Sequence, residues 1–263
     1  MDFPKRQLHY VNKLYKGANS FGDFVSKAMQ VDSEAFKAEC EFASANKLVC
    51  STFLNWMFDD IWSSGTWPTV DYYLEPKQIY YQMKKSYKPI IFSFYEDEKG
   101  FTHLFGVNNT LKDEKIKIEY YLKTFEGNLL EPKKCEILLS NEKNFDLKLL
   151  IKKTKPSNYL YVSYLINKEK RTSIDSNKFF SNYYFKNEFP FATKILNKNH
   201  VDIKIKAKTF VKSLFVNFKD NYKYLFSDNY LDLEKGETKI IHVGDKYPID
   251  MKTLKFSSFR GLK

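Results

Sequence analysis

The sequence is poor in cysteine and histidine, and neither residue type is grouped as a disulfide framework or a metal site would require. Its three cysteines, Cys40, Cys50 and Cys135, are an odd number and include no Cys-x-x-Cys pair. Its four histidines are scattered along the chain without the spacing of metal ligands. We therefore expect no disulfide framework, no metal ion and no cofactor.

Arginine is also scarce, because Arg6, Arg171 and Arg260 are the only ones in a chain with a net charge of +11. The lysines that supply the remaining positive charge alternate with apolar residues, as over 116–118 and 203–206, which is typical of the solvated face of strands. A nucleic-acid-binding surface would instead cluster its basic residues. Nucleic acid is therefore not an expected partner.

Long hydrophobic runs are missing as well. No run approaches the roughly 18 apolar residues of a transmembrane helix, and the first residues contain no apolar signal-peptide core. We therefore expect no membrane attachment, and the cytoplasm is the favoured location. With 43% hydrophobic and 17% aromatic residues, the chain nevertheless has enough apolar side chains for packed cores.

Tryptophan is concentrated in one short segment. Trp56, Trp62 and Trp67, the only tryptophans, fall within twelve residues, and the carboxylates Asp59 and Asp60 lie between the first two. Aromatic faces beside carboxylates suit a sugar, because a sugar offers C–H patches for stacking and hydroxyl groups for hydrogen bonds. This segment is the candidate binding site, and its chemistry predicts a carbohydrate ligand.

Regular structure is expected on both sides of the tryptophan segment. The apolar run 48–54 is short enough to be one buried strand, and the spacing predicts a helix over 76–88. A preceding helix is expected from the Asp32–Ser33 cap to about Asn46, after an irregular stretch over 1–32. This order of elements indicates one or two units of an α/β barrel, in which ligands bind after the strands.

From residue 89 the hydrophobic period changes from 3.6 to 2, which indicates β-structure. Short alternating segments are separated by turn residues, as in antiparallel sandwiches, and the polar run 167–177 is typical of a linker. The expected strands are 90–95, 102–108, 116–122, 137–139, 147–151, 159–166, 201–207, 214–218, 222–226 and 239–243.

The tryptophan segment resembles one part of a known family. It reads Trp-x-x-x-Asp-x-Trp from Trp56 and Trp-x-x-x-Asp-Tyr-Tyr from Trp67, followed by Pro-Lys and by Tyr-Tyr in a helix that ends at Lys-Pro. This order is similar to the eighth strand, loop and helix of the catalytic barrel in family-two glycoside hydrolases. Within that family it most resembles the β-mannosidase branch, whose pattern is roughly Trp-Gln-Leu-Asn-Asp-Cys-Trp-Pro.

Three positions depart from the β-mannosidase pattern. Met57 replaces the usual Gln, Asp59 replaces the usual Asn, and Ser63 replaces the usual Pro. Met57 resembles the related exo-β-glucosaminidases. An exo-β-glucosaminidase-like specificity is therefore an alternative to a β-mannosidase-like one.

A second resemblance lies near the C-terminus. Residues 226–233, followed by Gly-Glu, are similar to the C-terminal immunoglobulin-like domain of the same branch. The two resemblances imply a mixed, mostly β chain that begins with the C-terminal end of an α/β (TIM) barrel. The expected domains are a partial glycosidase barrel over 1–88, an immunoglobulin-like β-sandwich over 89–175 and a C-terminal immunoglobulin-like β-sandwich over 176–263.

The resemblance also implies a reaction. Retaining glycosidases need two carboxyl groups roughly 5 Å apart. In this family both come from strands upstream of the tryptophan segment, the acid/base within an Asn-Glu pair, and no Asn-Glu pair occurs here before Asn141. We therefore expect the C-terminal fragment of a β-mannosidase-like exo-glycosidase, which hydrolyses terminal β-mannosides when the barrel is complete and is inactive alone.

The same resemblance assigns substrate-binding residues but no catalytic residue. Asp60 would bond the hydroxyl groups of the terminal sugar, and Trp56 would form the floor beneath its ring. Asp59 and Trp62 are the two further candidates. The alternatives are structural: Trp56 would be a core residue, Asp60 a loop cap, and Trp62 a packing residue between barrel and sandwich.

Two other functions stay open at this point. The first is a non-catalytic β-sandwich module that binds carbohydrate or a protein partner. Such a module requires an exposed aromatic platform on a strand face. Alternatively, an upstream polypeptide would supply the rest of the barrel and restore activity. That barrel fragment and a β-mannoside or related carbohydrate are the expected partners.

Overall fold

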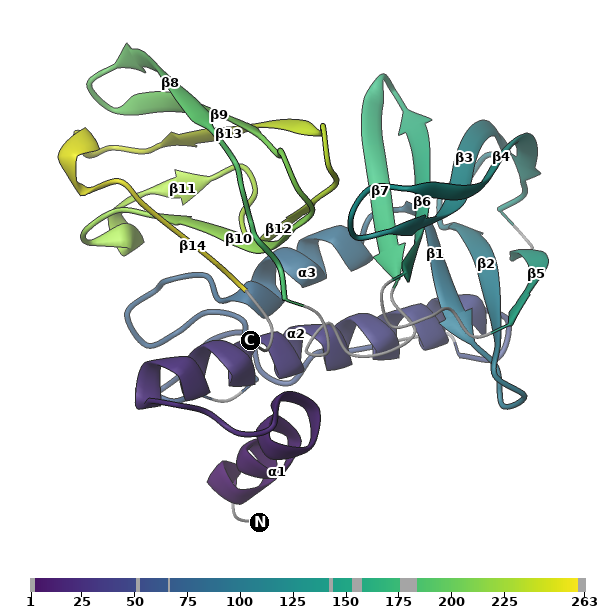
Figure 1. Cartoon of the computed structure of the whole chain (residues 1–263), viewed down its shortest axis with the longest axis horizontal. Coiled ribbons are helices and arrows are strands. Elements are labelled where there is room, and N and C mark those ends of the chain that lie inside the picture. Colours follow the sequence, from purple (N-terminus) through teal and green to yellow (C-terminus); the bar gives the residue numbers. More distant parts are fainter. Residues whose placement is uncertain are drawn as a thin grey trace. The chain divides into compact units, whose positions relative to one another are not determined.

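The computed structural model describes residues 3–50, 53–65, 67–141, 144–152, 158–175 and 184–259. The described chain is mostly β, with α-helices in its N-terminal third (Figure 1). It divides into two compact units, each built from segments far apart in the sequence. Unit 1 consists of Met1–Ser33, Trp56–Tyr81 and Ser181–Lys263, and unit 2 of Glu34–Asn55 and Gln82–Phe180. The domain boundaries that we expect at residues 88 and 175 stay a prediction.

Helices occupy most of the N-terminal region, so the irregular stretch predicted over 1–32 is wrong. The helix start predicted at Asp32–Ser33 is also wrong, because both residues lie inside a longer helix. The helix predicted over 76–88 is present and slightly shorter. The helices are α1 over Phe3–Tyr15, α2 over Phe21–Ala45 and α3 over Gln78–Ser86.

The true start of α2 is set by a reciprocal pair of hydrogen bonds. The backbone N–H of Asp23 donates to Ser20 Oγ at 3.2 Å, and the backbone N–H of Asn19 donates to the Asp23 carboxylate at 2.8 Å. Such a capping box satisfies N–H groups that the first helical turn leaves without partners. The sequence therefore contained the signal for this helix start, as Ser-x-x-Asp, twelve residues earlier than expected.

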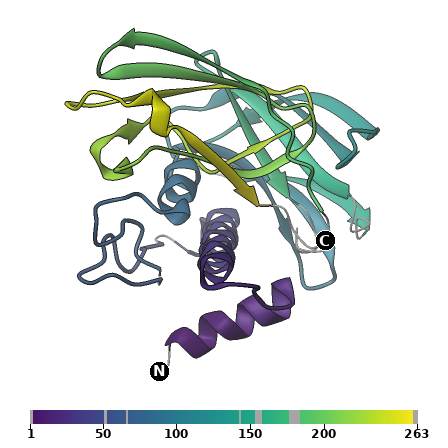
Figure 2. The ribbon, with the colours of Figure 1, turned by 60° about the vertical axis from the view of Figure 1, so that its left-hand side comes forward.

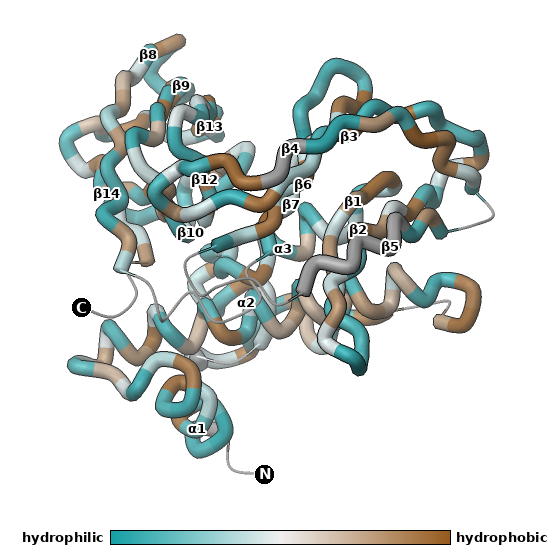
Figure 3. Tube along the Cα trace, turned by 45° about the vertical axis from the view of Figure 1, so that its right-hand side comes forward, coloured by the Kyte–Doolittle hydropathy of each residue, from teal (hydrophilic) through white to brown (hydrophobic). Residues whose placement is uncertain are grey.

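The strand predicted over 48–54 is also wrong. α2 is followed by a turn, in which the N–H groups of Val49 and Cys50 both donate to the carbonyl oxygen of Asn46, at 2.8 and 2.7 Å. Residues 53–55 form no helix or strand, while 51–52 lie outside the described residues. The apolar side chains of this turn are exposed, and they appear as a brown segment after α2 in Figure 3.

The physical reason is the absence of neighbours for such a strand. A buried parallel strand needs strands on both sides to take its N–H and C=O groups. The ladders between named strands in the described chain are all antiparallel, and the parallel pairing is one isolated bridge between Asp59 and Val70. A barrel fragment over 1–88 is thus not confirmed.

Unit 2 holds two antiparallel sheets, with strand orders β1-β2-β5 and β4-β3-β6-β7. Alternate residues such as Ile116, Ile118 and Tyr120 enter one core together with Phe92 and Leu104. The strands predicted between residues 90 and 166 are all present. They are β1 Ile90–Glu96, β2 Phe101–Asn108, β3 Glu114–Thr124, β4 Leu129–Leu139, β5 Phe145–Lys152, β6 Asn158–Ile166 and β7 Glu169–Asp175.

The last of these strands replaces most of the linker predicted over 167–177, of which 176–177 lie outside the described residues. β6 and β7 form a hairpin whose turn residues Asn167 and Lys168 have φ angles of 50° and 67°. Two positive φ angles in succession match the twist of a tight hairpin. β7 looked like a linker because it is an edge strand in which only Ile174 is buried.

Unit 1 holds the C-terminal sandwich, with strand orders β11-β13-β9-β8 and β12-β10-β14. Ile203, Ile205, Leu214 and Ile241 are fully buried between these two sheets. The elements are β8 Phe191–Asn197, β9 His200–Lys206, β10 Val211–Asn217, η2 Asn221–Lys223, β11 Leu225–Phe226, β12 Leu231–Leu233, β13 Thr238–Gly244, η3 Met251–Thr253 and β14 Lys255–Phe259.

Two features of this sandwich differ from a regular alternating pattern. The strand predicted over 222–226 is reduced to β11, because a turn of 3₁₀-helix, η2, occupies its first half. β8 lies at the edge of its sheet, and all of its residues are exposed (Figure 2, green hairpin). β8 pairs with β9 along one edge, and its other edge has no strand partner within the described chain.

Candidate functional site

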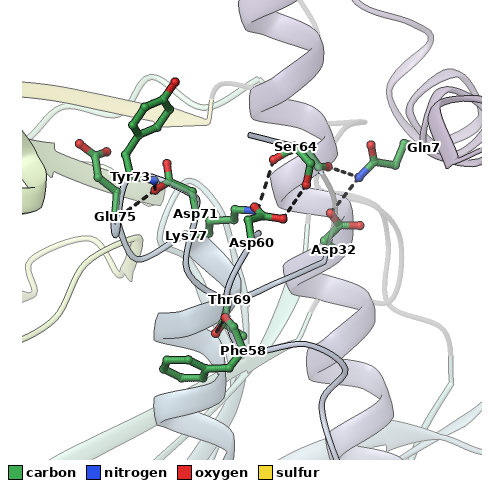
Figure 4. Close-up of polar contacts among 11 residues, drawn as sticks. Gln7, Asp32, Phe58, Asp60, Ser64, Thr69, Asp71, Tyr73, Glu75 and Lys77 are labelled. Carbon is green, nitrogen blue, oxygen red and sulfur yellow. Dashed lines mark hydrogen bonds and ion pairs between the residues drawn. The ribbon is translucent and has the colours of Figure 1, made fainter. Parts of the chain in front are cut away.

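The tryptophan segment is a long loop of unit 1 that folds back on itself. We call it the aromatic loop and define it as residues 56–77, of which residue 66 lies outside the described ones. The carbonyl oxygen of Phe58 accepts hydrogen bonds from the N–H groups of Thr69 and Val70, both at 2.9 Å, and from Thr69 Oγ1 at 2.6 Å. The N–H of Asp60 donates to the carbonyl oxygen of Val70 at 3.0 Å. These bonds join the two arms of the loop (Figure 4).

The second arm is held by a tight turn around Asp71. One carboxylate oxygen of Asp71 accepts the N–H groups of Tyr73 and Glu75, both at 2.8 Å. Leu74 adopts a left-handed backbone with a φ of 66°, and its N–H donates to the carbonyl oxygen of Asp71 at 3.0 Å. An Asp side chain that bonds backbone groups further along the chain is a common way to fix such a turn.

Asp60 is buried at the centre of the aromatic loop, where its carboxylate is already bonded within the protein. Ser64 Oγ donates to one carboxylate oxygen at 2.6 Å, and Lys77 Nζ forms an ion pair with the other (Figure 4). Lys77 is buried as well, and its ammonium group also donates to the carbonyl oxygen of Ser64 at 3.4 Å. Burial without such partners would be costly for either charge.

A second carboxyl group, that of Asp32 on α2, lies beside this ion pair. Gln7 Nε2 on α1 donates to Asp32 at 3.1 Å and also to the carbonyl oxygen of Gly65 in the loop. Burial raises the pKa of Asp32 to about 6, while the hydrogen bond from Gln7 and the charges of Lys77 and Arg6 act in the opposite direction. α1 and α2 thus provide polar partners for the loop.

Two of the three tryptophans of the loop are exposed, in contrast to this buried polar centre. Trp56 is 78% exposed and Trp62 is 64% exposed, and Asp59 is exposed between them. Trp56 is therefore not a core residue. Phe58 is exposed on one side and lies edge-on to Tyr80 of α3 on the other, with ring centroids 6.4 Å apart. Substrate binding by Trp56, Asp59, Asp60 and Trp62 stays a prediction.

The arrangement can bind a ligand but does not resemble a pair of catalytic carboxyl groups. Asp59 and Asp60 are adjacent in an extended segment, where successive side chains point to opposite faces. Accordingly, Asp60 is buried and bonded by Ser64 and Lys77, while Asp59 is exposed. What the loop offers is a hydrogen-bonded support with two exposed indole rings.

Sequence analysis found the tryptophans and the two carboxylates but missed Lys77, Ser64, Asp32 and Gln7. The sequence presents the Pro-Lys pair at 76–77 as a helix start and as part of the family resemblance, not as a partner of Asp60. The ion pair joins residues 17 positions apart, and such a separation follows no helix or strand period. Nothing in the sequence alone marks this lysine as buried.

Metal sites and membrane-spanning helices are absent from the described ranges. In this part of the chain, no group of three or more His, Cys, Asp or Glu side chains has an arrangement that would hold a metal ion. None of the described helices combines the length and the apolar composition needed to cross a bilayer.

Comparison with known proteins gives a family for the C-terminal strands and a fold for nearly the whole chain. Residues 190–257 match the family model of the Ig-fold domain of mannosidase type. No curated protein matches the chain.

Among solved structures, the β-D-mannosidase of Dictyoglomus thermophilum is 21% identical, with a TM-score of 0.80 over 98% of this chain and 32% of its own. The exo-chitosanase of Amycolatopsis orientalis is 14% identical, with a TM-score of 0.72 over 96% of this chain and 36% of its own. Likeness at these identities shows the fold. This chain spans about a third of the length of both structures. The resemblance found in the sequence is thus confirmed.

Proposed function

We propose that this chain forms the sugar-binding end of an exo-glycosidase acting on terminal β-mannosides. The premise is its fold, which is that of the C-terminal part of β-mannosidase-like glycosidases. The observation that carries the proposal is the aromatic loop, in which Trp56 and Trp62 are exposed beside the buried Asp60. Exposed indole rings on a fixed support suit stacking against a pyranose ring.

The reaction needs more than this loop supplies. A retaining mechanism uses one carboxylate as nucleophile and one carboxyl group as acid/base. Neither role suits Asp60, which Lys77 and Ser64 already bond, and the side chain of Asp59 is exposed on the other face of the segment. We therefore assign both catalytic groups to a separate barrel polypeptide, which is the proposed protein partner.

The test compares the 263-residue chain alone with the chain co-expressed with a polypeptide that carries the remaining barrel strands. We expect no hydrolysis of an aryl β-mannoside by the chain alone, because losing general acid/base help costs roughly 10²–10⁴ in rate and losing the nucleophile removes the mechanism. The complemented pair is expected to regain activity, and Trp56→Ala is expected to remove most of it.

One result would overturn this proposal. If the chain alone hydrolyses the β-mannoside after repurification, and Asp60→Ala abolishes that activity, the catalytic residues lie in this chain. Activity that survives Asp60→Ala in the same preparation would indicate a contaminating enzyme.

A second substrate class is favoured by one residue and one comparison. Met57 stands where the β-mannosidase pattern has Gln, and the chain shares its fold with an exo-chitosanase. The same complemented pair should be assayed with an aryl β-glucosaminide. Faster turnover of the glucosaminide than of the mannoside would assign the chain to the exo-β-glucosaminidase type.

A further inference from the structure

The conformation of the aromatic loop depends on a small set of contacts, because two isolated bridges are the only ladder pairings among its described residues. Three contacts end on Lys77. Its backbone N–H donates to the carbonyl oxygen of Thr69 at 2.8 Å, its Nζ pairs with Asp60, and its Nζ donates to the carbonyl oxygen of Ser64 at 3.4 Å. One residue thus bonds both arms of the loop, the second arm through its backbone N–H and the first arm through its side chain.

We propose that Lys77 is a positioning residue, which holds the aromatic loop in the conformation that presents Trp56 and Trp62 to a sugar. This inference rests on the proposed function. Lys77 immediately precedes α3, so its backbone is fixed by the helix. From there its side chain reaches back 17 residues to Asp60 and 13 residues to Ser64.

The place of Asp60 in the sequence explains why this contact controls the tryptophans. Asp60 lies four residues after Trp56 and two residues before Trp62. Its backbone N–H bonds Val70, and its carboxylate bonds Ser64 and Lys77. With Asp60 held at backbone and side chain, the short segments that carry both indole rings have little freedom to move.

The surroundings of the ammonium group indicate that it is more than a counter-ion for one carboxylate. Both side chains of the ion pair are nearly excluded from solvent, at 9% exposure for Lys77 and 3% for Asp60. Ser64 binds both partners of the pair, through its hydroxyl group and its carbonyl oxygen. Asp32 on α2 lies within electrostatic range of the same ammonium group. The charge of the lysine therefore acts on the loop and on α2.

Hydrogen exchange of backbone amides in the full chain tests this role directly. In Lys77→Met we expect the loop amides, such as those of Asp60, Thr69 and Val70, to exchange faster by roughly tenfold or more, because local opening then costs less. Lys77→Arg, which keeps the charge, should restore most of the protection. Peptides from β9 and β13 should exchange as in the wild type.

Lys212→Met is the matched control. Lys212 on β10 is also a buried lysine, paired with Asp232 at 2.7 Å, and it lies in the same unit outside the loop. Its substitution should accelerate exchange near β10 and leave the loop amides unchanged. Equal exchange of the loop in Lys77→Met and in the wild type would overturn the proposal.

A double variant separates positioning from charge balance. Asp60→Asn with Lys77→Met removes both charges, so no unpaired charge remains buried. If Lys77 only neutralises Asp60, the double variant regains wild-type loop protection, and the proposal fails. If Lys77 positions the loop, the loop still exchanges rapidly although the melting temperature recovers.

Calorimetric titration with an aryl β-mannoside keeps this inference distinct from the proposed function. We expect binding to the wild type, a loss of at least about tenfold in affinity in Lys77→Met, and rescue in Lys77→Arg. No binding to any variant, together with rapid loop exchange in Lys77→Met, would refute sugar presentation and leave the loop contact in place. Unchanged affinity in Lys77→Met would refute the positioning role itself.

Discussion

Asp32 is a residue whose burial makes the stability of the fold depend on pH. Its pKa is raised to about 6 from an ordinary value of 3.8, with burial as the main cause. For an acid with a raised pKa in the folded state, the stability is fully present below about pH 4 and falls as the pH rises through about 6. At pH 7 the charged carboxylate therefore destabilises unit 1.

Replacing this carboxyl group should remove the pH dependence. We expect Asp32→Asn to raise Tm at pH 7 by about 2–4 °C, the shift that roughly 1 kcal/mol produces in a protein of this size, and to leave Tm at pH 4 nearly unchanged. The amide oxygen still accepts the hydrogen bond from Gln7. Thermal unfolding at both pH values measures the effect, with the exposed Asp59→Asn as control. A lower Tm for Asp32→Asn at pH 7 would contradict this account.

At the scale of residues, the sequence reveals which side chains could bind a sugar but not which side chains are buried. The exposed tryptophans could be found because Trp56, Trp62 and Trp67 are close together in the chain. The polar centre of the loop could not, because Lys77, Asp60 and Asp32 meet only after the loop has folded against α1 and α2. Distances along the chain do not specify such contacts.

At the scale of elements, helix α2 carries a buried charge pair in unit 2. Lys37 Nζ lies 2.9 Å from the Glu41 carboxylate, one helical turn further on. Ser93 on β1 donates to the same carboxylate, and its hydroxyl lies 2.7 Å from that of Ser173 on β7. Burial raises the pKa of Glu41, while the charge of Lys37 acts in the opposite direction.

Removing one partner of this pair should be strongly destabilising. We expect Lys37→Met to lower the free energy of unfolding by about 3–5 kcal/mol, because it leaves the Glu41 carboxylate buried without its cation. The double variant Lys37→Met with Glu41→Met should recover part of this loss, because the buried carboxyl group of Asp175 still lacks the charge of Lys37. Urea unfolding followed by circular dichroism gives both values. An equal loss in the single and double variants would show that packing, and not charge, decides the stability here.

The predicted elements succeeded or failed according to how local their stabilisation is. Antiparallel strands such as β3 and β9 were found from alternation alone, because one face of each packs in a core within its own unit. The strand predicted over 48–54 failed because a parallel strand depends on neighbours that its own residues do not encode. β7 was missed because its hairpin turn, Asn167-Lys168, is a weaker signal than Asn-Gly.

At the scale of the whole molecule, large apolar side chains are exposed in two segments, the aromatic loop of unit 1 and the turn after α2 in unit 2. Single exposed apolar residues are ordinary on proteins, whereas runs of them indicate a surface that another molecule covers. The exposed residues of these two segments are Leu48, Val49, Leu54, Trp56, Phe58, Ile61 and Trp62.

We therefore predict that the isolated chain self-associates and binds a hydrophobic dye. Leu54→Ser combined with Ile61→Ser should reduce dye fluorescence and the apparent mass in light scattering. Leu111→Ser is the matched control, since Leu111 is equally apolar and is 93% exposed in a loop of unit 2. Equal reduction by the control would mean that the association is unspecific.

The position of the tryptophans also makes the protein its own optical probe. Light at the long-wavelength edge of the indole absorption hardly excites tyrosine, so the emission of this chain comes from one loop although it contains 19 tyrosines. The emission maximum therefore reports the polarity around residues 56–67 without any attached label. Circular dichroism, in contrast, reports the backbone of all helices and strands. If the emission changes at a lower temperature than the circular dichroism on heating, the loop is released before the rest of the fold melts.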